Sequence, residues 1–231
     1  MTADGIRGAI RAGLIGVLAC APVIGAAASV SWEADPNSSK AKRTRVSGVH
    51  STSSHPFWID RRGFIYGIEW SERNDKPCFL KIYTARLRGS KPSAQYGTEY
   101  DYEFRAKTFE MGGGCALNAS SLRKLHYQIP RAPGWKTNGL PKFINAVKVC
   151  GNDKRSSNDE RVKGITAYAV QVSPDGRFQN VGAELTERRT NCKKWYTKTA
   201  CPAGTAAYGV QVVGDLWLKG LQLECAPLKG H

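Results

Sequence analysis

The feature that most constrains this chain is a two-strand pattern that occurs three times. Each copy has a first run of alternating apolar and polar residues, then a loop, and then a second alternating run. Alternation with a period of two is typical of β-strands with one buried face. The copies are Ile65–Trp70 with Phe79–Leu87, Ile144–Val149 with Arg161–Val172, and Ala207–Val212 with Trp217–Cys225. Units of this kind bury their apolar faces by packing on one another, so the pattern predicts three strand pairs around one core.

The three copies align on a small residue in the first run, at Gly67, Ala146 and Gly209. The second runs align on Lys81, Lys163 and Lys219, and on Gly164 with Gly220. The alternation then buries Ile68, Val147 and Val210, and turns Glu69, Lys148 and Gln211 to the opposite face. The alternative is that these are unrelated strands of similar composition. We expect residues 57–231 to form a single all-β domain with three irregular repeats.

A strand-and-glycine unit that ends in Gly220-Leu221-Gln222-Leu223-Glu224-Cys225 resembles the vitelline-membrane outer-layer and jacalin-like β-prism families. The resemblance covers Phe57 to Leu228. It implies a three-fold pseudo-symmetric prism of three four-stranded sheets, and sugar binding as in lectins. Jacalin-type lectins bind sugar through a Gly-x-x-x-Asp loop. This sequence departs from that loop, because Leu218 stands four residues after Gly214, and Arg155 four residues after Gly151.

The first 28 residues have the pattern of a secretory signal peptide. Arg7 and Arg11 precede an uncharged, mostly apolar run, GLIGVLACAPVIG, and AAA follows at residues 26–28. These features predict cleavage before Ser29 and a secreted protein, extracellular or periplasmic. A membrane anchor is the alternative, although the run is shorter than the roughly 20 apolar residues that span a bilayer. Another alternative is a lipid-modified Cys20, since VLAC loosely resembles a lipoprotein motif.

Residues 29–56 have no strand or helix pattern. They are rich in serine, contain Pro36 and Pro56, and carry Lys40, Lys42, Arg43 and Arg45. We expect a flexible basic arm before the domain, either a solvated tail or an anion-binding segment.

The cysteine count agrees with export. Apart from Cys20 there are six cysteines, an even number that predicts three disulfides with 15 possible connectivities. They are Cys78, Cys115, Cys150, Cys192, Cys201 and Cys225. Cys192 and Cys201 are the closest pair in sequence, so a local bridge between them is the first expectation. The short paired spacing of zinc sites is missing, and we expect no metal and no cofactor.

Charge and aromatic residues together suggest the ligand. The chain has 34 Lys and Arg against 19 Asp and Glu, a net charge of +15. In an exported chain without a base-stacking motif, this charge favours an acidic carbohydrate or another anionic polymer over nucleic acid. Trp195 and Tyr196 lie between Cys192 and Cys201, beside Lys193 and Lys194, and Asp215 and Trp217 lie in the hairpin of the third copy. We predict that these six residues bind the ligand; the alternative is that the aromatic residues are core.

A binding module is therefore our first functional hypothesis, and a glycan-cleaving enzyme, hydrolase or lyase, is the second. Glu99, Asp101 and Glu103 alternate along one strand, and their crowding could raise a carboxyl pKa for acid–base chemistry. They could equally be an acidic strand edge that pairs with Arg105 and Lys107. An extracellular toxin or envelope-directed protein is the third possibility. His126 stands alone at the end of SSLRKLH, the only segment that suggests a short helix.

Overall fold

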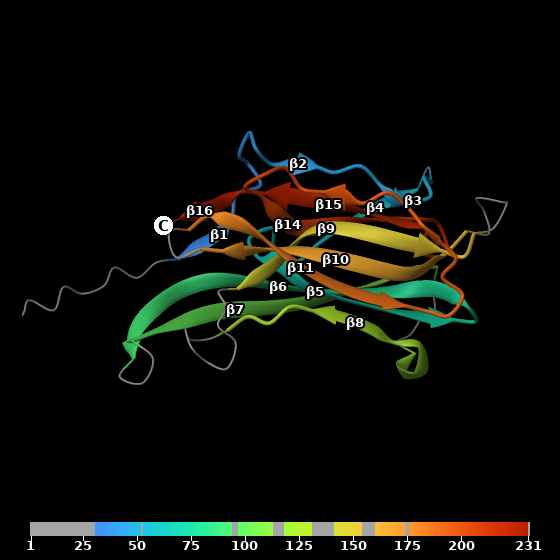
Figure 1. Cartoon of the computed structure of the whole chain (residues 1–231), viewed down its shortest axis with the longest axis horizontal. Coiled ribbons are helices and arrows are strands. Elements are labelled where there is room, and N and C mark those ends of the chain that lie inside the picture. Colours follow the sequence, from blue (N-terminus) through green and yellow to red (C-terminus); the bar gives the residue numbers. More distant parts are fainter. Residues whose placement is uncertain are drawn as a thin grey trace, which may run out of the picture.

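The computed structural model describes residues 31–51, 53–93, 97–112, 118–130, 141–153, 160–173 and 176–230. These residues form an all-β domain of three antiparallel sheets, one for each copy of the repeat. Figure 1 shows the central strand pairs of the three sheets running side by side along the long axis of the molecule. The described residues contain one 3-10 helix, Ala119–Ser121, and no helix long and apolar enough to cross a membrane.

Sheet 1 is built on the hairpin of the first copy. Its six strands follow the order β16-β1-β6-β5-β8, with β7 on β6. Their bounds are β1 Trp32–Ala34, β5 Phe64–Arg73, β6 Lys76–Ser93, β7 Gly97–Glu110, β8 Arg123–His126 and β16 Leu228–Gly230. The segment expected to be helical is thus a short 3-10 turn followed by β8, because its alternating residues pair with β5.

Sheets 2 and 3 are built on the second and third copies. Sheet 2 contains β9 Lys142–Gly151, β10 Val162–Val172, β11 Phe178–Arg188, β12 Lys194–Trp195 and β13 Thr199–Ala200. Sheet 3 contains β2 Lys42–Arg43, β3 Ser47–Gly48, β4 Ser54–Trp58, β14 Ala206–Val213 and β15 Gly220–Ala226. In each sheet the first and second runs of the repeat pair with each other.

The pairing confirms the three-fold repeat and corrects one detail of it. In every copy the register shifts just before the aligned small residue, Gly67, Ala146 or Gly209. Counted from there, Lys81 lies opposite Glu69, Thr166 opposite Lys148, and Gln222 opposite Gln211. Lys81 therefore corresponds to Thr166 and Gln222. Lys163 and Lys219 correspond to each other, and both lie closer to the hairpin turns.

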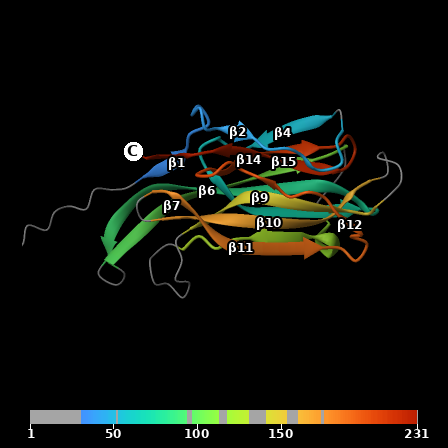
Figure 2. The same cartoon turned by 45° about the horizontal axis from the view of Figure 1, so that its top comes forward.

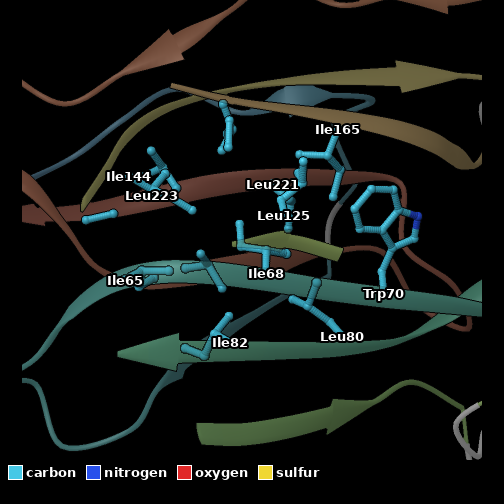
Figure 3. Packing of buried hydrophobic residues seen from close by; sticks show 14 of the residues in the cluster. Ile65, Ile68, Trp70, Leu80, Ile82, Leu125, Ile144, Ile165, Leu221 and Leu223 are labelled. Carbon is cyan, nitrogen blue, oxygen red and sulfur yellow. The ribbon is translucent and has the colours of Figure 1, made fainter. Parts of the chain in front are cut away.

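The core lies where the three inner faces meet. Side chains of all three sheets converge in Figure 3, among them Ile68, Ile165 and Leu221. Ile68, Val147 and Val210 are buried as predicted. Glu69 and Gln211 point to the outer faces but are only 6% and 4% exposed, because other polar side chains cover them.

The hairpins of the three copies turn at the same end of the prism, which we call the hairpin end. Backbone hydrogen bonds join the sheets there. The Leu218 amide donates to the Pro77 carbonyl at 2.6 Å, and the Val162 amide donates to the Leu218 carbonyl at 2.9 Å. These three residues occupy corresponding positions of the repeat. Main-chain hydrogen bonds therefore join the three sheets around the pseudo-symmetry axis at this end.

The opposite end, which we call the aromatic end, is packed with rings. Trp32, Phe64, Phe143, Tyr102 and Phe178 contact one another with centroid separations of 5.0–6.5 Å. Most of these contacts are edge-on or tilted, the arrangement that aromatic pairs prefer. Figure 1 places β1 and the C-terminal strand β16 at this end.

The expected arm at residues 29–56 is wrong for the residues that the structure describes. From Trp32 onward the segment supplies β1 to β4, and Trp32 is 5% exposed. These strands are too short to show a periodic pattern, and they form by pairing with sheet edges provided by distant parts of the chain. Lys42 and Arg43 are exposed on an outer strand, where charged residues are common.

The structure contains disulfides Cys150–Cys192 and Cys201–Cys225, with Cα–Cα distances of 5.7 and 5.6 Å. The expected Cys192–Cys201 bridge is wrong, because the chain between these residues runs along β9 as β12 and β13 and carries them apart. Cys78 is also disulfide-bonded. Cys20, Cys115 and the expected signal peptide lie outside the described residues. Disulfides of this kind are consistent with an oxidising compartment.

Candidate binding site at the hairpin end

The turn between β5 and β6 positions the first group of the site. Arg73 pairs with Lys76, and the two residues between them, Asn74 and Asp75, have positive φ angles of 51° and 61°. This is the geometry of a two-residue hairpin, for which Asn and Asp are favoured. It places Asp75 at the tip, with its carbonyl and carboxylate turned toward sheet 2.

Lys163 of β10 binds this turn from the neighbouring sheet. Its ammonium group lies 2.7 Å from the Asp75 carbonyl, 2.7 Å from Asp75 Oδ1 and 3.0 Å from Glu72 Oε1. The Lys163 side chain is 0% exposed and that of Glu72 is 2% exposed. A buried ion pair of this kind holds only when both charges are well coordinated.

Two more side chains complete the coordination of Asp75. Asn191 Nδ2 donates to Asp75 Oδ1 at 3.0 Å, and Arg161 lies 3.7 Å from Oδ2. Partial burial alone would raise the pKa of Asp75, but the hydrogen bonds from Lys163 and Asn191 lower it below its ordinary value. The carboxylate is therefore charged at neutral pH.

Trp217, in the turn of sheet 3, is surrounded by cations. The Lys76 ammonium and the Arg161 guanidinium each lie 5.0 Å from the ring centroid, and the Lys219 ammonium lies 5.9 Å from it. Cations at this distance are attracted to the indole face. Asp215 in the same turn lies 3.7 Å from Lys219, and hydrogen bonding with Ser53 lowers the pKa of its carboxyl.

Buried polar atoms without a hydrogen-bond partner gather at this end. Among the described residues there are five such side-chain atoms, and four belong to the group just described: Glu72 Oε2, Arg161 Nε, Asn191 Oδ1 and Trp217 Nε1. Glu72 Oε2 has only an ion-pair contact, 3.6 Å from Arg189 Nε. An unpaired buried polar group costs about 1–3 kcal/mol, so four of them in one place are groups that ordered water or a ligand would satisfy.

Tyr196 and Lys194 lie on the segment that follows the Cys150–Cys192 disulfide, beside the hairpin end. β12 pairs with the last residues of β9, as Figure 2 shows. Tyr196 is hydrogen-bonded to Glu160, and burial, with this bond, raises the pKa of its hydroxyl. Gly151 makes room for the pair, because a Cβ there would lie 2.9 Å from the Tyr196 ring and still closer to Glu160. Lys194 contacts the Tyr196 ring at 5.4 Å and Asp153 at 3.9 Å.

Trp195 lies on the outer face of sheet 2. It pairs with Cys150, and the Lys148 ammonium lies 5.5 Å from its ring centroid. Trp195 and Tyr196 are both half-buried, and Lys193 is exposed. The chain links this group to the Trp217 group, since Glu160 contacts Tyr196 and the next residue, Arg161, contacts Trp217.

The sequence indicated Trp217 and Asp215 but missed the residues that surround them. Glu72, Asp75, Arg161, Lys163 and Asn191 come from three separate stretches of the chain, and single charged residues in loops carry no signal of a site. The one available signal was the Lys-Gly pair shared by the second and third copies, which places Lys163 and Lys219 next to the turns.

The carboxylates of the enzyme hypothesis lie elsewhere, on β7. Glu103 binds Arg86 at 2.6 Å, and hydrogen bonding with Arg86 lowers the pKa of its carboxyl. A carboxyl with a lowered pKa is the opposite of the raised one that a general acid needs. The strand opposite, β6, supplies this arginine, since Arg86 pairs with Glu103.

Comparison with known proteins finds no matching family model and no matching curated protein sequence. Solved structures of lectins do resemble the chain. Calystegia sepium agglutinin matches with 12% identity and a TM-score of 0.42, covering 81% of this chain and 97% of that one. Artocarpin complexed with Me-alpha-mannose matches with 8% identity and a TM-score of 0.41, over 82% and 99%. Malaysian banana lectin matches with 9% identity and a TM-score of 0.38, over 81% and 99%. The likeness lies in the fold, a β-prism of three sheets.

Proposed function

We propose that this protein is a secreted carbohydrate-binding module whose hairpin end binds an acidic glycan. The observation that carries the proposal is the group of four unpaired buried polar atoms around Trp217 and Asp75. Arg161 Nε and Trp217 Nε1 are donors, whereas Glu72 Oε2 and Asn191 Oδ1 are acceptors. Sugar hydroxyl groups both donate and accept hydrogen bonds, so one class of ligand can satisfy all four.

The charge around the ring selects an acidic sugar. Lys76, Arg161 and Lys219 surround Trp217; Asp75 lies 3.7 Å from Arg161, and Asp215 lies 3.7 Å from Lys219. Lys76 makes no ion pair with any described residue. A carboxylate or sulfate on the glycan would meet this positive field, which also raises the association rate.

The predicted residues on the neighbouring segment extend the same surface. Tyr196 and Lys194 continue it from Arg161 through Glu160, and Trp195 with Lys193 borders it on the outer face of sheet 2. A polysaccharide several residues long would contact both groups. Export of the protein is supported by the sequence pattern of residues 1–28 and by the disulfides.

An array of acidic and neutral polysaccharides, read at several salt concentrations, tests the proposal. We expect binding to polymers that carry carboxylate or sulfate. The affinity should fall steeply from low to physiological salt, because the release of counterions from the polymer on binding becomes less favourable as the salt concentration rises. Equal binding to neutral glycans, or an affinity that does not depend on salt, would contradict the assignment of an acidic ligand.

Substitutions at two tryptophans locate the ligand. Trp217→Phe keeps a ring but removes the unpaired N–H, and should weaken binding less than Trp217→Ala. Trp195→Ala should weaken binding by about 1–3 kcal/mol, the value for loss of an aromatic stacking platform, with thermal stability nearly unchanged. If Trp195→Ala instead unfolds early and its folded fraction binds normally, Trp195 is a packing residue. Trp58→Ala is the matched control, because Trp58 also carries a cation, Arg61 at 4.0 Å, but pairs with Gly209 of β14 instead of lying in the hairpin turn that carries Trp217.

A further inference from the structure

A second cluster of rings lies on the outer face of sheet 1, away from the hairpin turns. Four consecutive strands contribute one ring each: His126 from β8, Tyr66 from β5, Tyr83 from β6 and Phe104 from β7. Tyr66 contacts the other three with centroid separations of 5.9–6.2 Å, and Tyr83 lies 4.5 Å from His126. Phe104 is 40% exposed, one of three exposed large hydrophobic residues in the described chain. We call these four rings the platform.

Gly67 allows the platform to form. It pairs with His126 on one side and with Tyr83 on the other. A Cβ at this position would lie 2.7 Å from Cδ2 of His126, so any other residue would push the imidazole ring away. In sheet 1, the small residue that marks each copy of the repeat thus leaves room for the rings of Tyr83 and His126.

The corresponding positions of the other sheets carry different groups. In sheet 2, Ala146 is flanked by Ala200 and Tyr168. In sheet 3, Gly209 is flanked by Trp58 and by the carboxylate of Glu224. The three-fold backbone therefore does not require rings on both sides of this position. Two flanking rings with an exposed Phe beside them belong to sheet 1, which indicates a role beyond folding.

Charge around the platform is positive. Glu69 is the acidic group at its base, and its two oxygens are engaged: Oε2 accepts from the Tyr83 hydroxyl at 2.9 Å, and Oε1 lies 3.3 Å from His126 Nε2 and 3.7 Å from Lys124. Lys81 adds a second ammonium group, 4.9 Å from the Tyr83 ring centroid. Two lysines thus share one carboxylate that is already bound.

We propose that the platform is a binding site for a uronic acid residue of an acidic polysaccharide, separate from the hairpin end. The apolar face of the sugar ring stacks on Phe104 and Tyr66, and its carboxylate binds Lys81 and Lys124. A neutral sugar would leave these lysines without an anion. A cationic ligand would be repelled by them.

Trigalacturonic acid is the probe, because three sugar residues are short enough to report each site by itself. The His126 imidazole signals, assigned in the full chain by comparison with His126→Gln, should shift as this trisaccharide is added. The neutral trisaccharide maltotriose should not shift them. Phe104→Ser should lower the affinity reported by His126 about tenfold, the equivalent of roughly 1.4 kcal/mol of lost stacking. Because Phe104 is 40% exposed, its replacement should lower the melting temperature only slightly.

Two further variants separate this site from the hairpin end. Tyr168→Ser, at the position of sheet 2 that corresponds to Tyr83, should leave the His126 titration unchanged. Trp217→Ala should abolish binding at the hairpin end and also leave the His126 titration unchanged. Constant His126 signals at saturating trisaccharide, or an equal shift with maltotriose, would overturn the uronic acid site without affecting the proposal for the hairpin end.

Discussion

The two ends of the prism bury opposite kinds of side chain. At the aromatic end, Trp32, Phe64 and Phe143 pack against one another, and no described polar side-chain atom there is buried without a hydrogen bond. At the hairpin end, Lys163 and Glu72 are buried together, and four polar atoms lack partners. Burial at the aromatic end removes apolar rings from water and so stabilises the fold. Burial at the hairpin end holds polar groups in a fixed arrangement at a cost in stability, and for this reason we propose it as the binding end.

The difference between the two ends is tested most directly by substituting the largest ring of the aromatic end. Trp32→Ala removes a buried indole and should lower the free energy of unfolding by about 3–5 kcal/mol. Urea denaturation measures this loss. Glycan affinity of the remaining folded protein should equal that of wild type, because Trp32 lies far from the hairpins. If Trp32→Ala instead lowered the glycan affinity with little loss of stability, the aromatic end and not the hairpin end would be implicated in binding.

Lys163→Met tests the buried charges of the hairpin end. The change leaves Glu72 buried without its nearest cation, so we expect a loss of about 3–5 kcal/mol, as for other broken buried pairs. Lys219→Met is the matched control, since Lys219 corresponds to Lys163 in the repeat but binds the half-exposed Asp215. If denaturant titrations gave similar losses in the free energy of unfolding for both variants, burial of the Lys163–Glu72 pair would not be the cause of the loss.

Removal of the Cys150–Cys192 disulfide tests whether this bridge holds the neighbouring segment in place at the hairpin end. The double substitution of both cysteines to serine should destabilise the chain by about 2–4 kcal/mol. It should also weaken glycan binding, because the bridge fixes the segment that carries Asn191 and Tyr196. Opening Cys201–Cys225 in the same way is the control, with a comparable change in melting temperature but a smaller change in affinity. Equal effects of the two bridges on affinity would contradict this view.

The smallest expected effect is a difference in acid stability at Asp75. A carboxyl whose pKa is lowered by folding stabilises the protein above its ordinary pKa of 3.8, and this contribution is lost as the pH falls through the lowered value. Wild type should therefore be slightly more stable than Asp75→Asn at pH 5 to 7, and the difference should shrink below pH 3.8. Denaturation at several pH values measures it. A difference that grows toward low pH would have the wrong sign.

The strands could be predicted because their signal is local. Ile68, Val147 and Val210 alternate with polar neighbours, and nothing outside the strand is needed to identify the buried face. Register across a hairpin is not local. Lys81 was aligned with Lys163 and Lys219 because turns of different length hide the pairing. The strands of residues 32–58 also escaped prediction, since each is short and forms only against an edge that residues far along the chain provide.

The site was predictable only where one stretch of sequence carries it. Trp217 and Asp215 share a hairpin turn with Lys219, so their proximity follows from the repeat. Lys163 and Glu72 are 91 residues apart and meet only because two sheets pack together. His126 was interpreted as an isolated histidine for the same reason, as its partners Glu69 and Tyr83 lie on other strands. Disulfide pairing depends on the same packing and could not be derived from spacing.

The pairing of β1 with β16 has a consequence for how the molecule can be attached to something else. Trp32 lies opposite Gly230, so the chain enters and leaves the domain at neighbouring points of the aromatic end. A tether, tag or fusion partner joined before β1 or after β16 therefore starts from the end farthest from the three hairpin turns. Attachment directly before β1 or directly after β16 would therefore leave the three hairpin turns on the side away from the support.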